Sequence, residues 1–214
     1  MDNTTYTDMA KACQLAETHA LQLEGESLSK ARQEAERSGL RQGSAAQAGL
    51  LRFMVRTLKA DSIISVGTGA IVEALQLVAG LDGAGQLTAV DSSARGITII
   101  RRIFSDLNDQ EASHTTLRAV NTSPAAFLPR LNAESYDLIV VSGNASNYEP
   151  TFEQAHHLLK TGGRVAFADM AGVASGEPDK PQAMKALLGQ IEEDDRFETV
   201  LTSLGTGLLV ACKR

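Results

Sequence analysis

The first part of the chain carries an apolar pattern typical of helices. Five apolar positions recur at steps of three or four residues, which places them on one helical face: Met9, Cys13, Ala16, Ala20 and Leu23. A stretch of alternating charges at 29–37 suits a solvated helix, and Gly39 and Gly43 interrupt it. We therefore predict a helical flap over residues 1–43 and a separate domain over residues 44–214.

In the second part, an amphipathic helix at 50–58 is followed by short apolar runs that alternate with amphipathic stretches. Runs of this kind are typical of buried parallel strands, and the stretches between them have helical spacing. The predicted strands are 63–66, 86–90, 116–120, 137–141 and 164–168. Strands that alternate with helices predict an α/β fold with a doubly wound parallel sheet.

Two prolines indicate where later helices begin. Pro150 fits the first turn of a helix that Gly162 and Gly163 would end, because proline is favoured early in a helix and glycine just after it. Pro181 lies near the start of a further helix around 184–191.

The end of the chain has a different pattern. Two strand-like runs at 197–204 and 208–212 are separated only by residues 205–207. A connection this short can join antiparallel strands but not parallel ones. The sequence therefore predicts a mostly parallel sheet that a C-terminal antiparallel hairpin completes.

Composition excludes several classes of partner. The 214 residues contain 20 Lys and Arg against 26 Asp and Glu, for a net charge of −6, and aromatic residues are 4% with no Trp. Nucleic-acid binding needs a basic surface or stacking aromatics, so it is not expected. No apolar run is long enough to span a membrane. Two cysteines, Cys13 and Cys212, make no disulfide framework, and we expect a cytoplasmic protein.

Candidate chemistry lies where the predicted strands end, because ligands of open parallel sheets bind beyond the carboxyl ends of the strands. Gly67 and Gly69 allow a tight turn after the first strand and a close approach of the backbone to a ligand. Asp91 ends the next strand, 24 residues after Gly67. A carboxylate at this point can accept hydrogen bonds from ribose hydroxyls, which indicates a nucleoside cofactor. The alternative is that Asp91 caps the following helix.

A nicotinamide dinucleotide does not fit this pattern. Val72 stands where the last glycine of a G-x-G-x-x-G motif is required. No lysine stands four positions after Tyr6, Tyr136 or Tyr148, as a single-domain dehydrogenase needs.

From about residue 44 to residue 214 the chain resembles the catechol and caffeoyl-CoA type O-methyltransferases, which use S-adenosylmethionine. The matching stretches are 63–69, 85–91, 136–141, 158–163 and 207–214. The resemblance implies a Rossmann-like, seven-stranded sheet with one antiparallel strand and an N-terminal helical flap. It also implies a small-molecule methyl acceptor and a homodimer.

The resemblance also assigns roles to residues. The 67–69 turn would lie close to the methionine part of the cofactor, Asp91 would hold the ribose, and Ser44 would approach the carboxylate. Ser92 would contact the adenosine, and Thr122 and Ser123 would line the adenine. The cofactor-binding residues that we predict are Ser44, Ser65, Gly67, Thr68, Gly69, Glu73, Asp91, Ser92, Thr122, Ser123 and Ser142.

Two departures from the family pattern concern charge in the cofactor site. Ser65 replaces an acidic residue that is a partner of the cofactor ammonium group, and Glu73 stands where a serine is frequent. Glu73 could take over the role of the missing acid, or it could repel the cofactor carboxylate. The sequence leaves both possibilities open.

The metal site of the family is also altered. Its Asp-Ala-Asp-Lys stretch reads Ser-Gly-Asn-Ala at 142–145, and its Asp-Asn pair reads Asp169-Met170. Mg²⁺ binds hard oxygen ligands, and methionine offers a soft thioether. We therefore expect no divalent metal. Asp169 is the candidate catalytic residue, as a general base if burial raises its pKa, although it could equally cap a turn.

Two functions remain open from the sequence. The first is an S-adenosylmethionine-dependent methyltransferase that methylates oxygen on a small molecule without metal, mainly by holding the reacting groups in line. The second is a catalytically silent dimer that binds S-adenosylmethionine or S-adenosylhomocysteine and has a binding or regulatory role. The lost metal ligands and lysine favour the second.

Overall fold

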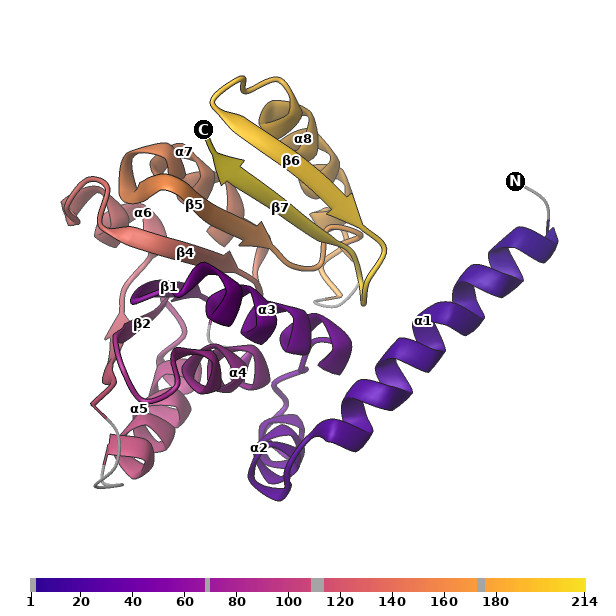
Figure 1. Ribbon diagram of the computed structural model, residues 1–214, viewed down its shortest axis with the longest axis horizontal. Helices are drawn as coiled ribbons and strands as arrows, with labels where there is room; N and C mark the ends of the chain where they lie inside the picture. Colours follow the sequence, from indigo (N-terminus) through magenta and orange to yellow (C-terminus); the bar gives the residue numbers. More distant parts are fainter. Residues whose placement is uncertain (1–2, 68–69, 109–113, 173–175) are drawn as a thin grey trace.

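The computed structural model describes residues 3–67, 70–108, 114–172 and 176–214 (Figure 1). Seven strands form one sheet in the order β3-β2-β1-β4-β5-β7-β6. They are β1 (Ser62–Val66), β2 (Gln86–Asp91), β3 (Thr116–Asn121), β4 (Tyr136–Val141), β5 (Leu159–Phe167), β6 (Phe197–Thr202) and β7 (Leu208–Lys213). The helices are α1 (Asn3–Leu23), α2 (Glu26–Arg37), α3 (Ala45–Leu58), α4 (Ile71–Leu81), α5 (Ala94–Asn108), α6 (Pro124–Phe127), α7 (Tyr148–Leu158) and α8 (Lys180–Glu192).

The strand order confirms a doubly wound α/β fold. The chain builds outward from β1 to β3, crosses back to β4, and continues to the opposite edge. The pairs among β1 to β5 are parallel, and β7 is antiparallel to both β5 and β6. The predicted C-terminal hairpin is therefore confirmed. The order of the strands reverses between β1 and β4, which is where such sheets bind ligands.

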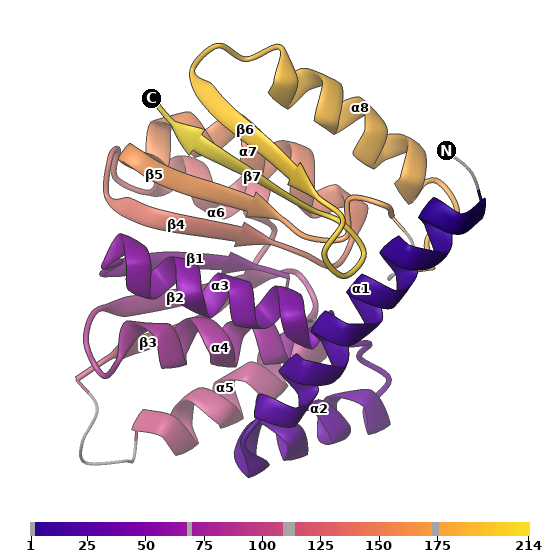
Figure 2. The same cartoon turned by 45° about the vertical axis from the view of Figure 1, so that its right-hand side comes forward.

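Helices cover both faces of the sheet because adjacent strand residues point to opposite sides. Ile63 of β1 belongs to an apolar cluster with α3, α4 and α5, whereas its neighbour Ile64 belongs to a cluster with α7 and α8. All five residues of β1 are buried, as expected for a strand covered on both sides. Figure 2 shows α3, α4 and α5 on one side of the sheet and α6, α7 and α8 on the other.

The prediction that Gly162 and Gly163 end a helix is wrong. Helix α7 ends at Leu158, and both glycines lie inside β5. Leu159 is buried and extended, pairs with Tyr136, and accepts a 2.8 Å hydrogen bond at its carbonyl from Lys213 Nζ. The pairing shifts register after Tyr136, and Gly162 has a φ of +77° beside this irregularity. These long-range contacts select an early strand, which local glycine preferences could not indicate.

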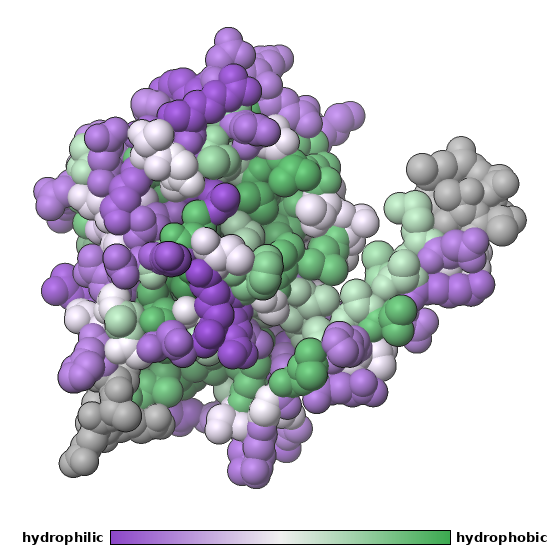
Figure 3. All heavy atoms as spheres, in the orientation of Figure 1, coloured by the Kyte–Doolittle hydropathy of each residue, from purple (hydrophilic) through white to green (hydrophobic). Residues whose placement is uncertain are grey.

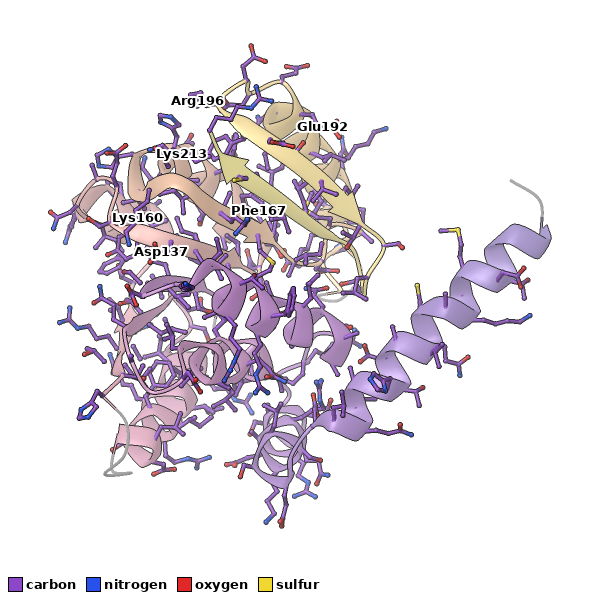
Figure 4. The ribbon with its side chains drawn as sticks, viewed as in Figure 1. Asp137, Lys160, Phe167, Glu192, Arg196 and Lys213 are labelled. Atoms are coloured by element: carbon purple, nitrogen blue, oxygen red, sulfur yellow. The ribbon has the colours of Figure 1, made fainter. Side chains whose placement is uncertain are left out.

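A carboxylate connects the amino-terminal ends of β1 and β4. Asp137 Oδ2 accepts hydrogen bonds from the backbone N–H groups of Asp61 at 2.9 Å and Ser62 at 3.0 Å. Its other oxygen forms a 2.7 Å ion pair with Lys160 of β5 (Figure 4). These contacts fix the starts of three adjacent strands relative to one another.

The N-terminal helices form an arm beside the sheet. Helix α1 projects from the body of the molecule (Figure 1). Glu17 of α1 connects it to the start of α3, where its carboxylate accepts hydrogen bonds from Ser44 Oγ and from the N–H groups of Ala45 (2.8 Å) and Ala46 (3.2 Å). Among the described residues, no helix is both long and apolar enough to cross a membrane.

Candidate functional site

A cavity of about 330 Å³ opens at the carboxyl ends of β1, β4 and β5. Its wall combines the loops that follow β4 and β5 with the first turns of α3, α4 and α8, and the segment 39–43 covers it. Thr206 contributes from the loop between β6 and β7. The strands end together here because Val66 of β1 pairs with Val141 of β4, and Val141 pairs with Phe167 of β5.

The turn after β1 requires glycine at position 67. Gly67 has a φ of +93°, and a Cβ atom there would lie 2.2 Å from the carbonyl oxygen of Ser142. Its N–H donates to the carbonyl of Val90 at 2.9 Å, which ties the turn to β2. Thr68 and Gly69, which we also predicted as cofactor-binding residues, lie outside the described residues.

Glu73 lies in the first turn of α4 and faces the cavity. Its side chain is 2% exposed, and Oε1 accepts a 3.3 Å hydrogen bond from Gln47 Nε2 of α3. Within the described part of the chain, Glu73 Oε2 and Gln47 Oε1 are buried with no hydrogen-bond partner. Burial raises the pKa of Glu73 to about 7; the Ser142 hydroxyl opposes this rise and the Asp169 carboxylate adds to it.

A buried ion pair forms a second part of the cavity wall. Lys180 Nζ lies 2.9 Å from Asp169 Oδ2, and the two side chains are 1% and 7% exposed. The same ammonium group donates to the carbonyl of Gly143, in the loop after β4, and lies 4.9 Å from the ring centre of Tyr148. Tyr148 in turn donates a 2.7 Å hydrogen bond to the carbonyl of Ala168. The ammonium group thus connects the loops after β4 and β5.

Asp91 occupies the predicted position at the end of β2. Its Oδ1 accepts a 3.1 Å hydrogen bond from the N–H of Ser93, and Ser93 Oγ in turn accepts from Gly96 at the start of α5. The residue that caps α5 is therefore Ser93. The carbonyl of Asp91 accepts from Thr122 N–H at 3.0 Å, which joins the ends of β2 and β3.

Four further predicted residues lie around the same edge but outside the cavity wall. Ser123 caps α6, with Oγ accepting from the N–H of Ala126 at 3.3 Å. Ser44 caps α3, with Oγ accepting from the N–H of Gln47 at 3.2 Å, and it donates to Glu17. Ser65 is buried within β1, and Ser92 is exposed after β2.

The cavity wall therefore brings together Glu73, Ser142 and Asp169 of the predicted residues. Sequence reasoning missed Gln47 and Lys180. Lys180 could have been noticed in the sequence, because a lysine in the first turn of a helix interacts unfavourably with the helix dipole, which indicates a compensating contact. Gln47 carried none.

The other reactive side chains form no further centre in the described ranges. Cys13 and Cys212 are free thiols. No three His, Cys, Asp or Glu side chains among the described residues come together in a way that could hold a metal ion.

Comparison with known proteins identifies the family. A family model described as O-methyltransferase matches residues 18–214. A protein of Mycobacterium sp. (strain JLS), provisionally named as an O-methyltransferase, is 31% identical over 169 residues, which cover 77% of this chain and 76% of that protein.

Solved structures show the same fold. A Staphylococcus aureus protein provisionally named as a caffeoyl-CoA O-methyltransferase has a TM-score of 0.77 at 16% identity, covering 94% of this chain and 98% of that one. The O-methyltransferase of Bacillus cereus, solved with S-adenosylhomocysteine, has a TM-score of 0.74 at 17% identity, covering 92% and 96%. Together with the family match, these similarities confirm the resemblance seen in the sequence. The chain belongs to the O-methyltransferase family.

Proposed function

We propose that this protein transfers the methyl group of S-adenosylmethionine to an oxygen atom of a small molecule, without a divalent metal. The observation that carries the proposal is the cavity at the switch point between β1 and β4, whose wall contains buried acceptor atoms and a buried ion pair. An S-adenosyl ligand in the related Bacillus cereus structure supports the choice of cofactor.

The residues of this edge fit the cofactor. A Cβ atom at Gly67 would lie 2.2 Å from the carbonyl oxygen of Ser142, so glycine lets the turn after β1 pack against the residue that follows β4. We place the methionine part of the cofactor against this turn. Asp91 would hold the ribose, with Ser92, Thr122 and Ser123 beside the adenosine at the ends of β2 and β3. Ser44, Ser65, Thr68, Gly69, Glu73 and Ser142 complete the proposed binding set.

S-adenosylmethionine supplies an electrophilic methyl group on a sulfonium centre when it is bound. The contribution of this chain is to hold the acceptor oxygen in line with that group, and such positioning can supply much of the rate. Asp169 and Lys180 form an ion pair in the cavity wall, and we propose that the acceptor binds beside this pair. We assign Asp169 the reception of the acceptor proton and Lys180 the stabilisation of the oxygen as it becomes negative.

The same pair supports a mechanism without metal. Asp169 is the carboxylate that remains of the family metal site, and the Lys180 ammonium group already neutralises it. A divalent cation at Asp169 would lie next to this positive charge in a buried site, where repulsion is strong. The ammonium group therefore takes the place of a metal ion beside the acceptor.

Calorimetric titration with S-adenosylhomocysteine and methyl transfer to a panel of phenols test the function together. Thermal unfolding measures the same binding, because a ligand at a hundredfold excess over Kd should raise the unfolding free energy by about 2.7 kcal/mol. Asp91→Ala should weaken binding about tenfold to a hundredfold, because it removes hydrogen bonds to a charged acceptor. Asp195→Ala is the control, because it removes a carboxylate at an exposed position outside the cavity wall.

Three outcomes would contradict parts of the proposal. Absence of binding would overturn the cofactor. Binding without transfer to any acceptor would favour the silent, ligand-binding alternative. Transfer that stops when EDTA is added and resumes with Mg²⁺ would overturn the metal-free mechanism.

We further propose a homodimer and a cytoplasmic location. Large apolar side chains are exposed on α1 (Met9, Leu15, Leu21 and Leu23), on α3 (Phe53) and on β6 (Val200 and Leu201). Figure 3 shows apolar surface along α1 and on the neighbouring part of the body. An apolar surface of this kind supports burial against a second copy of the chain. Two free cysteines support the cytoplasmic location.

A further inference from the structure

Two acceptor atoms in the cavity wall have no donor. Glu73 Oε2 and Gln47 Oε1 are buried and lack a hydrogen-bond partner among the described residues. An unpaired buried acceptor costs free energy, so most such atoms in folded proteins are satisfied. Two of them on adjacent side chains, joined by the 3.3 Å hydrogen bond from Gln47 Nε2 to Glu73 Oε1, indicate a place that a ligand completes.

A single group that satisfies both acceptors needs at least two N–H or O–H bonds. A carboxylate ligand would add acceptors and a like charge beside Glu73. An ammonium group has three donors and a positive charge, so it matches one carboxylate oxygen and one amide oxygen together.

Within the described part of the chain, no cation forms an ion pair with Glu73, although Arg41 lines the same cavity wall. Arg32 of α2, Lys180 of α8 and Asp169 are the charged groups that act on it. Arg32 is paired with Glu24, and Lys180 is paired with Asp169 at 2.9 Å. Both cations therefore already have a carboxylate. Among the described residues, Glu73 has two neutral donors beside it, the Gln47 amide at 3.3 Å and the Ser142 hydroxyl, and it is in no ion pair.

The position of the pair fits one end of the proposed cofactor. Glu73 is in the first turn of α4, directly after the turn that follows β1, and Gly43 covers it so closely that a Cβ atom there would lie 2.8 Å from Glu73 Oε1. The methionyl end of an S-adenosyl compound carries an ammonium group. We infer that Glu73 and Gln47 bind the α-ammonium group of the cofactor. This inference rests on the proposed function and answers whether Glu73 attracts or repels the ligand.

The ionisation of Glu73 gives an independent signature. Burial raises its pKa to about 7, so about half of the ligand-free molecules carry a proton on Glu73 at neutral pH. A bound ammonium group favours the ionised carboxylate. Binding should therefore release about half a proton per site at pH 7.

Calorimetry with two ligands tests the inference. The ligands are S-adenosylhomocysteine and its analogue without the α-amino group. For the wild type, loss of the amino group should weaken binding about tenfold to a hundredfold. Glu73→Gln should weaken S-adenosylhomocysteine by a similar factor and leave the analogue within about twofold of the wild type, because the lost interaction is the same one. Gln47→Leu should show the same pattern with a smaller factor.

The control variant is Gln76→Leu, which removes a buried amide one turn further along α4 and outside the cavity wall. It should leave both affinities unchanged. Titrations in two buffers of different ionisation enthalpy should show proton release for the wild type and none for Glu73→Gln. Circular dichroism checks that each variant is folded.

The outcomes separate this inference from the proposed function. If the wild type binds S-adenosylhomocysteine and Glu73→Gln weakens both ligands equally, or strengthens the one with the amino group, only the inference is overturned. If the wild type binds neither ligand, the proposed function fails and the inference fails with it.

Discussion

At the scale of single residues, Glu73 binds its proton more tightly in the folded state than in the unfolded chain. Its pKa is raised from 4.5 to about 7, mainly by burial. Between these values the folded protein keeps the proton and the unfolded chain releases it, so stability falls as the pH rises through this window and is level above it. Glu73→Gln removes this effect. The unfolding free energy of the ligand-free variant minus that of the wild type should therefore rise by about 3 kcal/mol when the pH is raised from 4.5 to 8.

Urea denaturation at the two pH values measures this gain. Glu153→Gln on α7 changes an exposed carboxyl group in the same way and serves as the control. An equal response of both variants to pH would contradict the burial of an ionisable group at position 73.

Lys180 and Asp169 should be strongly coupled. Each charge is almost fully buried, so removal of one partner leaves a buried charge without its ion pair. Lys180→Met should therefore destabilise the protein by about 3–5 kcal/mol, whereas Lys180→Met combined with Asp169→Asn should recover most of the loss. Asn is the choice at position 169 because the backbone there has a φ of +55°, which Asn tolerates.

Chemical denaturation of the two single variants and the double variant gives the coupling free energy. Losses that simply add would mean that the two charges act independently.

The sequence could place Asp169 at the end of a strand, because that position follows from the strand pattern. It could not place Lys180 beside it, since the contact joins the end of β5 to a helix whose position depends on the whole fold.

At the scale of elements, two helical glycines should respond in opposite ways to the same change. A Cβ atom on Gly80 of α4 would lie 2.7 Å from Val55 Cβ of α3, whereas one on Gly49 of α3 would meet nothing within 4 Å. Alanine is favoured over glycine inside a helix by about 1 kcal/mol. Crowding of a packed interface costs about 1–3 kcal/mol. Gly49→Ala should therefore stabilise the protein, and Gly80→Ala should destabilise it.

Thermal unfolding of both variants tests how tightly α3 and α4 pack. Stabilisation by both substitutions would show that α3 and α4 are farther apart in solution.

The elements themselves were largely predictable, and their exceptions have a physical cause. The parallel strands are buried runs, such as 137–141, whose character is local, and the hairpin follows from the short connection at 205–207. The boundary between α7 and β5 was not predictable, because Leu159 is extended to meet Tyr136 and Lys213. Local sequence preference predicts an element correctly where the tertiary contacts favour the same conformation. Where they favour another conformation, as at Leu159, the tertiary contacts determine the structure.

At the scale of the whole molecule, the position of α1 bears on how the protein assembles. Leu15 and Leu23 are both 73% exposed on a helix that projects from the body, although Glu17 fixes its connection to α3. Exposure of these leucine side chains to water is unfavourable in free energy, and burial against another surface would remove this exposure. The proposed homodimer would cover them with a second copy of the chain.

The double variant Leu15→Glu with Leu23→Glu should therefore turn a dimer into a monomer. Glutamate is favoured in helices, so α1 itself should remain folded, while a charge at each position opposes burial. Light scattering after size exclusion should give twice the chain mass of 22.7 kDa for the wild type and the single mass for the variant. Gln14→Glu at an exposed polar position of the same helix should leave the dimer intact. A wild type that is already monomeric at micromolar concentration would instead mean that α1 is open to a different partner.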